Sequence, residues 1–298
     1  MWGGTDGYGE AENRRSDGAA YDPLRHRWRL IADGPLDERA RHLATWTGTE
    51  MLVWGGRRSN YIAPPDAAAY DPATDTWRQI AASPIAYGSN AGSVWTGTEW
   101  VIVATDLDGN TAIAAYDPSA DRWRSLPSVD DSFDGGTALV WTGDEIVLSS
   151  SSGMYRLGID NEEWDRPEPY GQGIYGSIAW TGEQVIGISR HFGDVDWGHL
   201  IAWVPQSDSW QDLPQPPYNI YQGDVVWTGE RAVLVGEGLA FDPASGEWWT
   251  LGNTVGAGNW RRGAVTLWAG DRLFVWGGMG YGEAPEMYSI GYVLIPEW

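Results

Sequence analysis

The chain alternates short apolar runs with turns rich in glycine, proline and aspartate from one end to the other. In residues 42–80, for example, such turns separate apolar runs at 42–46, 51–54, 67–70 and 76–80. Short runs bounded by turn residues are typical of β-strands, and no long segment shows the 3.6-residue apolar period of a helix. The pattern therefore predicts an all-β protein built from four-stranded units.

The four-strand pattern repeats along the whole sequence. A turn of the Trp-Thr-Gly type joins the first two expected strands of each repeat, and its tryptophan recurs every 39 to 49 residues, at Trp46, Trp95, Trp141, Trp180, Trp227 and Trp268. A period of this length is typical of a solenoid or a propeller. Four-stranded antiparallel units repeated radially make a β-propeller, so the repeats predict a single propeller domain over residues 1–298.

A second motif, Tyr-Asp-Pro-x₄-Trp, joins the third and fourth expected strands. Full copies begin at Tyr21, Tyr70 and Tyr116, weaker ones at Trp203 and Phe241, and a degenerate one lies between Tyr155 and Trp164. Together with segments 39–42, 52–56 and 69–77, this motif resembles the kelch repeat family over essentially the whole chain. The resemblance implies four-stranded antiparallel kelch-type blades and, because most kelch propellers are recognition platforms, a binding function.

Four repeats depart from the family pattern where a Gly-Gly pair should follow the second strand. The replacements are Ala104-Thr105, Ser149-Ser150, Ile188-Ser189 and Gly236-Glu237. These changes put individual bulges and loops in question more than the architecture.

The strand count favours seven blades. Residues 1–32 supply three expected strands, five complete sets of four follow, and the C-terminal part supplies three, the last at either 286–288 or 292–295. The total is two short of seven blades, and both absent strands would precede Met1, so we expect the chain to lack two N-terminal strands. The alternative is a six-bladed ring with the surplus strands packed outside. An incomplete ring would leave strand edges open to pairing with another chain.

Composition and charge limit the kinds of partner that the protein is expected to bind. The formal net charge is −22, which argues against nucleic acid because phosphates would be repelled. No apolar run approaches the roughly 20 residues that span a bilayer, so no transmembrane segment is expected. No signal sequence is present in this chain, and the compartment stays open, with an extracytoplasmic or cell-envelope location in a bacterium as the favoured interpretation. The 21 tryptophans mostly occupy repeating positions, where packing between blades explains them.

Candidate binding residues lie where the chain enters the innermost strand of each blade, on the face that carries the variable loops. Functional groups concentrate on variable loops held by a rigid scaffold. The candidates are Arg41, His42, Asn90, Asp134, Tyr175, Gln222, Trp260, Arg261 and Arg262. Aromatic faces, amides and guanidiniums together suit a sugar or an anionic small molecule. The alternative is that they cap loops and line a water-filled channel.

The sequence contains no clear pattern of a catalytic or metal-binding site. The absence of cysteine excludes the Cys-Tyr copper site of galactose oxidase-like proteins, and an anion clamp as in sialic acid mutarotase-like proteins cannot be matched residue by residue. His191 and His199, with Asp194 and Asp196, could chelate a divalent ion, but the spacing is not that of a metal site. Segment 106–110 resembles part of a calcium loop without the downstream glutamate, so a plain turn is preferred.

Two functions remain. The first is a non-enzymatic propeller that binds a protein or glycan through its variable face, with no cofactor, no metal and no catalytic residue. The second is a carbohydrate-active enzyme, mutarotase-like or lyase- or hydrolase-like, that uses Asp134 or another channel acid with Arg41. An enzyme needs a perturbed acid or base in a closed pocket, whereas a platform can present an open surface.

Overall fold

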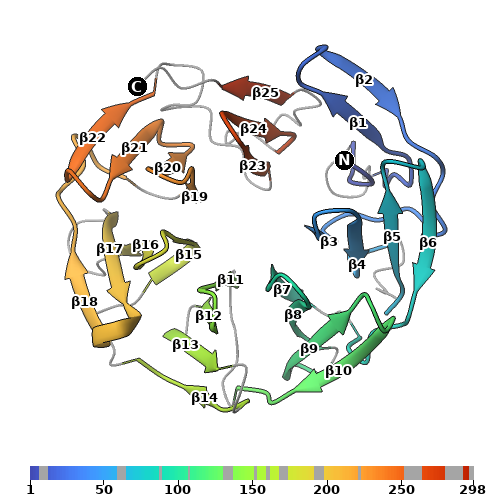
Figure 1. The fold of residues 1–298 in the computed structure, drawn as a ribbon, viewed down its shortest axis with the longest axis horizontal. Coiled ribbons are helices and arrows are strands. Elements are labelled where there is room, and N and C mark those ends of the chain that lie inside the picture. Colours follow the sequence, from blue (N-terminus) through green and yellow to red (C-terminus); the bar gives the residue numbers. More distant parts are fainter. Residues whose placement is uncertain are drawn as a thin grey trace. The chain divides into compact units, whose positions relative to one another are not determined.

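The computed structural model confirms the all-β prediction. It describes residues 1–6, 13–58, 65–86, 89–106, 108–129, 137–150, 153–158, 162–167, 174–190, 198–220, 223–251, 264–278 and 291–294. Within these ranges the regular structure is strand apart from one 3₁₀ turn at Pro205–Ser207, and no helix there is long and apolar enough to cross a membrane. The chain forms two compact units, unit 1 (residues 1–133) and unit 2 (residues 134–298), and Figure 1 labels their strands.

Unit 1 contains a two-stranded sheet and two four-stranded sheets, each an antiparallel meander. The strands are β1 (Ala19–Asp22) and β2 (Arg27–Leu30), then β3 (Leu43–Trp46), β4 (Met51–Trp54), β5 (Ala67–Asp71) and β6 (Thr76–Ile80), then β7 (Ser89–Trp95), β8 (Trp100–Thr105), β9 (Thr111–Asp117) and β10 (Arg122–Leu126). An isolated antiparallel bridge joins Trp2 to Gly18, which places the first residues beside β1. The apolar runs of the sequence thus locate the strands of β3–β6 to within a residue.

Unit 2 contains three four-stranded sheets and one of three strands. The strands are β11 (Ala138–Trp141), β12 (Glu145–Ser150), β13 (Gly153–Gly158) and β14 (Trp164–Asp165), then β15 (Ile174–Trp180), β16 (Val185–Arg190), β17 (Gly198–Val204) and β18 (Ser209–Asp212), then β19 (Asp224–Trp227), β20 (Ala232–Val235), β21 (Leu239–Asp242) and β22 (Glu247–Thr250), and last β23 (Val265–Ala269), β24 (Arg272–Trp276) and β25 (Gly291–Leu294). Of the two places predicted for the last strand, β25 overlaps the second, and the first lies outside the described residues.

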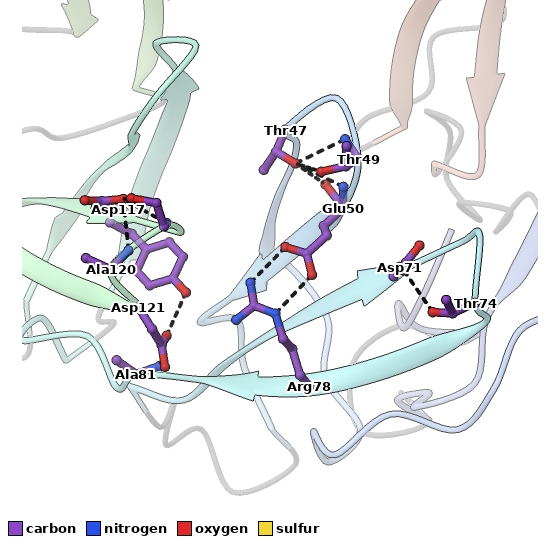
Figure 2. Close-up of polar contacts among 12 residues, drawn as sticks. Thr47, Thr49, Glu50, Asp71, Thr74, Arg78, Ala81, Asp117, Ala120 and Asp121 are labelled. Atoms are coloured by element: carbon purple, nitrogen blue, oxygen red, sulfur yellow. Dashed lines mark hydrogen bonds and ion pairs between the residues drawn. The ribbon is translucent and has the colours of Figure 1, made fainter.

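The Trp-Thr-Gly turn is explained by its own hydrogen bonds. In the β3–β4 turn the Thr47 hydroxyl accepts the backbone N–H of Glu50 at 3.0 Å and donates to the Glu50 carbonyl at 3.2 Å (Figure 2). Gly48 between them has a φ of +103°, a left-handed conformation that favours glycine. The same threonine bond recurs in the first hairpin of four other sheets, at Thr96, Thr142, Thr181 and Thr228. The repeated motif is therefore a requirement of the turn.

Within each unit, consecutive sheets pack face to face. In unit 1, Trp54 of β4 and Trp100 of β8 are fully buried in one cluster, which joins the second and third sheets. In unit 2, Leu200 of β17 and Phe241 of β21 belong to a cluster that joins the sheet β15–β18 to the sheet β19–β22. The first strands of these consecutive sheets are also neighbours. Packing between sheets accounts for buried tryptophans such as Trp54, but Trp46 is 52% exposed.

A polar clamp also joins neighbouring sheets in unit 1. Ala32, which follows β2, donates its N–H to the Asp75 carboxylate at 3.2 Å and accepts the Trp77 indole N–H at its carbonyl at 2.9 Å. Asp75 lies in the β5–β6 turn with a left-handed φ of +57° and also accepts the Tyr70 hydroxyl at 2.6 Å. The tyrosine and tryptophan of the Tyr-Asp-Pro-x₄-Trp motif therefore act together on the preceding sheet.

The clamp is repeated one sheet later. Ala81, which follows β6, donates its N–H to Asp121 at 2.9 Å (Figure 2). Its carbonyl accepts the Trp123 indole N–H at 2.8 Å. Asp121 again has a left-handed φ, +46°, and accepts the Tyr116 hydroxyl at 2.7 Å. The two copies match bond for bond, so the clamp is part of the repeat.

Candidate functional site

Asp224 in unit 2 is a carboxylate in an unusual environment. It is the first residue of β19, and its Oδ2 accepts the Thr266 hydroxyl of the neighbouring strand β23 at 3.0 Å. Solvent reaches the side chain, yet protein atoms crowd it on most sides. This crowding raises the pKa of Asp224 because it penalises the charged form, and the Thr266 bond offsets only part of the effect.

A buried glutamate lies at the same end of this sheet. Glu237 is 3% exposed and stands in the tight turn between β20 and β21, flanked by Gly236 and Gly238 with φ of +95° and +66°. Its backbone carbonyl accepts the Tyr218 hydroxyl at 2.7 Å. The turn is thus tied to the segment that leads from β18 to β19.

Gly223, the residue before Asp224, packs against that turn. A Cβ atom at Gly223 would lie 2.6 Å from the Val235 carbonyl oxygen and 3.9 Å from Cγ of Glu237. Contacts under 3.0 Å are not found for real Cβ atoms, so only glycine allows this approach. Because Asp224 follows Gly223 directly and pairs with Val235, the two acidic residues belong to one end of the sheet.

Tyr218 completes the group, which we call the β19 acidic site: Tyr218, Asp224, Glu237 and Thr266. The phenol ring is 39% exposed, and its pKa is raised, first by partial burial and then by the charge of Glu237. The Asp224 carboxylate contacts Thr266 and the Tyr218 hydroxyl contacts the Glu237 backbone, so the four residues place an exposed carboxylate, hydroxyls and one ring surface at the same end of the sheet. Such groups can hold hydroxyl-bearing or cationic ligands. Among the described residues, no group of three or more His, Asp or Glu side chains could hold a metal ion.

The residues predicted from sequence are only partly described. Arg41 and Asn90 occupy matching positions in unit 1, at the starts of the neighbouring strands β3 and β7, and both have left-handed φ, +59° and +49°. For Tyr175 the backbone alone is described, within β15. Asp134, Gln222, Trp260, Arg261 and Arg262 lie outside the described residues. Arg41 and Asn90 therefore hold equivalent backbone positions on neighbouring strands, and the predicted binding site stays a prediction.

His42 packs within unit 1. Its ring meets the Trp2 ring edge-on with centroids 5.3 Å apart, and its Nδ1 is buried without a hydrogen-bond partner among the described residues. Burial lowers the pKa of His42 to about 4, and the positive charges of Arg39 and the chain's amino terminus contribute. The imidazole is therefore neutral near pH 7.

The structure describes only some of the residues that the sequence suggested as metal ligands. His199 lies in β17 with its Nε2 3.5 Å from Asp212 Oδ1, while residues 191–197, which include the other three candidates, are not described. In the 106–110 segment, the Asp106 carboxylate accepts the backbone N–H groups of Asp108 and Asn110 at 2.9 and 2.8 Å. The preferred interpretation of a plain turn agrees with these bonds.

Sequence reasoning missed the β19 acidic site. The available signal was Glu237, which stands where the kelch-like pattern has the second glycine of a Gly-Gly pair. A large charged residue in a tight turn indicates a special environment, yet the sequence does not reveal that Tyr218 and Gly223 pack against it. Comparison with known proteins finds no family model and no curated protein that matches the chain.

Proposed function

We propose that this protein is a kelch-type β-propeller that recognises a glycan through the loop end of its sheets. The repeated antiparallel sheets, packed face to face within each unit, support this architecture. Seven blades remain the favoured count, with six as the alternative. A propeller would gather the starts of all first strands around one channel, where the predicted binding residues and the β19 acidic site would meet.

The observation that carries the proposal is the β19 acidic site. Carboxylates accept hydrogen bonds from sugar hydroxyls, and an exposed phenol ring can cover an apolar sugar face. Asp224 is reached by solvent and fixed by Thr266, so its acceptor atoms are already oriented before a ligand arrives. Oriented groups of this kind lower the entropic cost of binding. A glycan fits this chemistry better than an anionic ligand, which the exposed Asp224 carboxylate would repel.

The alternative is a carbohydrate-active enzyme in which Asp224 is the acid. A carboxyl with a raised pKa keeps its proton at higher pH and can protonate a leaving group. This perturbed acid is the specific observation that favours the enzyme. Asp224 takes the role that the sequence assigned to Asp134 or to another channel acid.

Binding to a glycan array tests the proposal, with Asp224→Asn and Thr266→Val as the site variants. Asp271→Asn is a matched control, because Asp271 lies in the same unit with its side chain 71% exposed. We expect Asp224→Asn to lower affinity for a bound glycan about tenfold or more, Thr266→Val to lower it less, and the control to leave it unchanged. Binding that survives Asp224→Asn would show that the β19 acidic site does not bind the glycan. A folded wild-type chain that binds no glycan would contradict the proposal. Turnover of a bound glycan that is lost in Asp224→Asn would establish the alternative.

A further inference from the structure

Strand β2 stands out on the surface of unit 1. All four of its residues are exposed, and Trp28 and Leu30 are 47% and 79% exposed. In the turn before it, Leu24 is 83% exposed. Its only sheet partner among the described strands is β1, so its second edge is unpaired there. An exposed edge with large apolar side chains is a template for pairing with another chain.

Two of these apolar residues, Leu24 and Leu30, are not a property of the repeat, whereas Trp28 is the tryptophan of the repeated motif. The positions of Leu24 and Leu30 hold Ala73 and Gln79 in the next sheet. In the third sheet they hold Ser119 and Ser125. Single exposed apolar residues are ordinary, but two exposed leucines beside the exposed Trp28, where related hairpins have small or polar residues, mark an interaction surface.

The same strand is locally basic in a strongly acidic protein. Arg27 and Arg29 alternate with Trp28 and Leu30, so the two kinds of side chain lie on opposite faces of the strand. The Arg27 side chain makes no hydrogen bond or ion pair with the rest of the described chain, whereas Arg29 pairs with Asp75 at 2.9 Å. Against a net charge of −22, this strip would attract an acidic partner.

We propose that the free edge of β2 binds an extended acidic segment of another protein as an added β-strand. In such pairing, main-chain hydrogen bonds give affinity and alternate side chains give specificity. The partner strand that fits alternates acidic residues, facing Arg27, with apolar residues, facing Trp28 and Leu30. This surface lies on unit 1 and does not depend on the β19 acidic site.

The test uses the full chain and three capped octapeptides. One alternates Val and Glu, one contains the same residues in two blocks, and one alternates Val and Lys. We expect the alternating Val-Glu peptide to bind best and to change the tryptophan fluorescence. Methylation of every second backbone nitrogen of that peptide should abolish binding, because it removes the N–H groups that pair with a strand edge.

Matched variants locate the site. Arg27→Glu and the double variant Leu24→Ala, Leu30→Gln should each weaken binding about tenfold or more. The second restores residues found at these positions in the next sheet, so it should leave thermal unfolding unchanged. Arg122→Glu is the control, since Arg122 holds the position of Arg27 on β10, where Ser125 replaces the leucine.

Several outcomes would overturn the proposal. Equal binding of the block peptide would mean simple charge attraction, and equal loss in Arg122→Glu would mean an effect of overall charge. Absence of binding to the folded wild-type chain at millimolar peptide would show that β2 accepts no such strand. If neither a peptide nor a quencher changes the fluorescence of Trp28, another part of the chain covers this face.

Discussion

The sheet junctions of the two units differ in the bond to the clamp aspartate, and the difference explains a motif position. In unit 1, Ala32 both donates to Asp75 and accepts from Trp77. In unit 2, Trp248 donates its indole N–H to the Pro214 carbonyl at 3.0 Å, so the tryptophan bond is kept. Proline has no N–H to donate, and Gly246 stands where the aspartate would be.

The carboxylate is thus present where a backbone N–H needs an acceptor. Gly246 keeps the left-handed φ, +73°, that Asp75 also adopts. At Asp208, in the β17–β18 turn of unit 2, the carboxylate accepts the Trp203 indole N–H at 3.0 Å, which replaces the tyrosine bond of unit 1. The aspartate therefore has a structural role in the repeats, whereas Asp224, to which we assign ligand binding by proposal, lies outside this motif.

A second pair of positions differs between the units. In unit 1, Arg78 forms a two-bond ion pair with Glu50 across its sheet, at 3.0 and 2.8 Å (Figure 2). In unit 2, the corresponding position of the sheet β19–β22 holds Trp249, and Arg231 lies over its ring at 4.5 Å. An ion pair in one sheet and an arginine–aromatic contact in the other thus each join the first hairpin to the fourth strand.

The largest expected effect is acid sensitivity of unit 1 through His42. Its folded-state pKa of about 4 lies below the ordinary 6.5, so the unfolded state binds the proton more readily. The stabilisation is present above pH 6.5 and is lost as the pH falls toward 4, by up to about 3 kcal/mol. Urea unfolding followed by tryptophan fluorescence should show this loss.

His42→Gln should flatten that pH dependence. Asp224 in unit 2 contributes a pH dependence of stability with the opposite sign. Because its pKa is raised in the folded state, the free energy of unfolding falls as the pH rises above the ordinary 3.8. Unchanged pH dependence in His42→Gln would show that the imidazole is not the acid-sensitive group.

The next largest loss of stability is expected when the carboxylate of the clamp is removed. Asp75→Ala should destabilise unit 1, because it leaves the Ala32 N–H and the Tyr70 hydroxyl without their acceptor. Partial exposure of Asp75 keeps the loss from being larger. Denaturant unfolding measures it, with Asp71→Ala, which removes bonds only inside its own turn, as the comparison. An equal loss in both variants would mean that the bond between sheets adds nothing.

The smallest effect separates the two cross-sheet contacts. Arg78→Gln should cost about 0.5 kcal/mol and cost less in 1 M salt, because the ion pair is partly exposed and is screened. Arg231→Gln should cost about 1 kcal/mol, since the arginine lies against an aromatic ring. Stability measured at two salt concentrations distinguishes them, and a salt-independent Arg78 would argue against the ion pair.

Sequence patterns predicted what depends on neighbours along the chain. The Thr47 turn and the β5–β6 turn follow from residues within a few positions, so the strands between them could be located. The Ala32 clamp could not, because its acceptor is 43 residues away and the motif does not state its target. Asp224 is one of 41 acidic residues, and its environment depends on Thr266, 42 positions later. Contacts of that range depend on how the sheets pack.

We infer that the aspartate occurs in the clamp because it accepts a backbone N–H. A double-mutant cycle of Pro214→Ala and Gly246→Asp tests it in unit 2, where a Cβ at Gly246 would lie 3.4 Å from the Pro214 ring. Each single variant should destabilise, the first by leaving a new N–H without an acceptor and the second by strain at a positive φ. We predict that the pair recovers about 1 kcal/mol relative to the sum of the single effects. Strict additivity in denaturant unfolding would contradict the account.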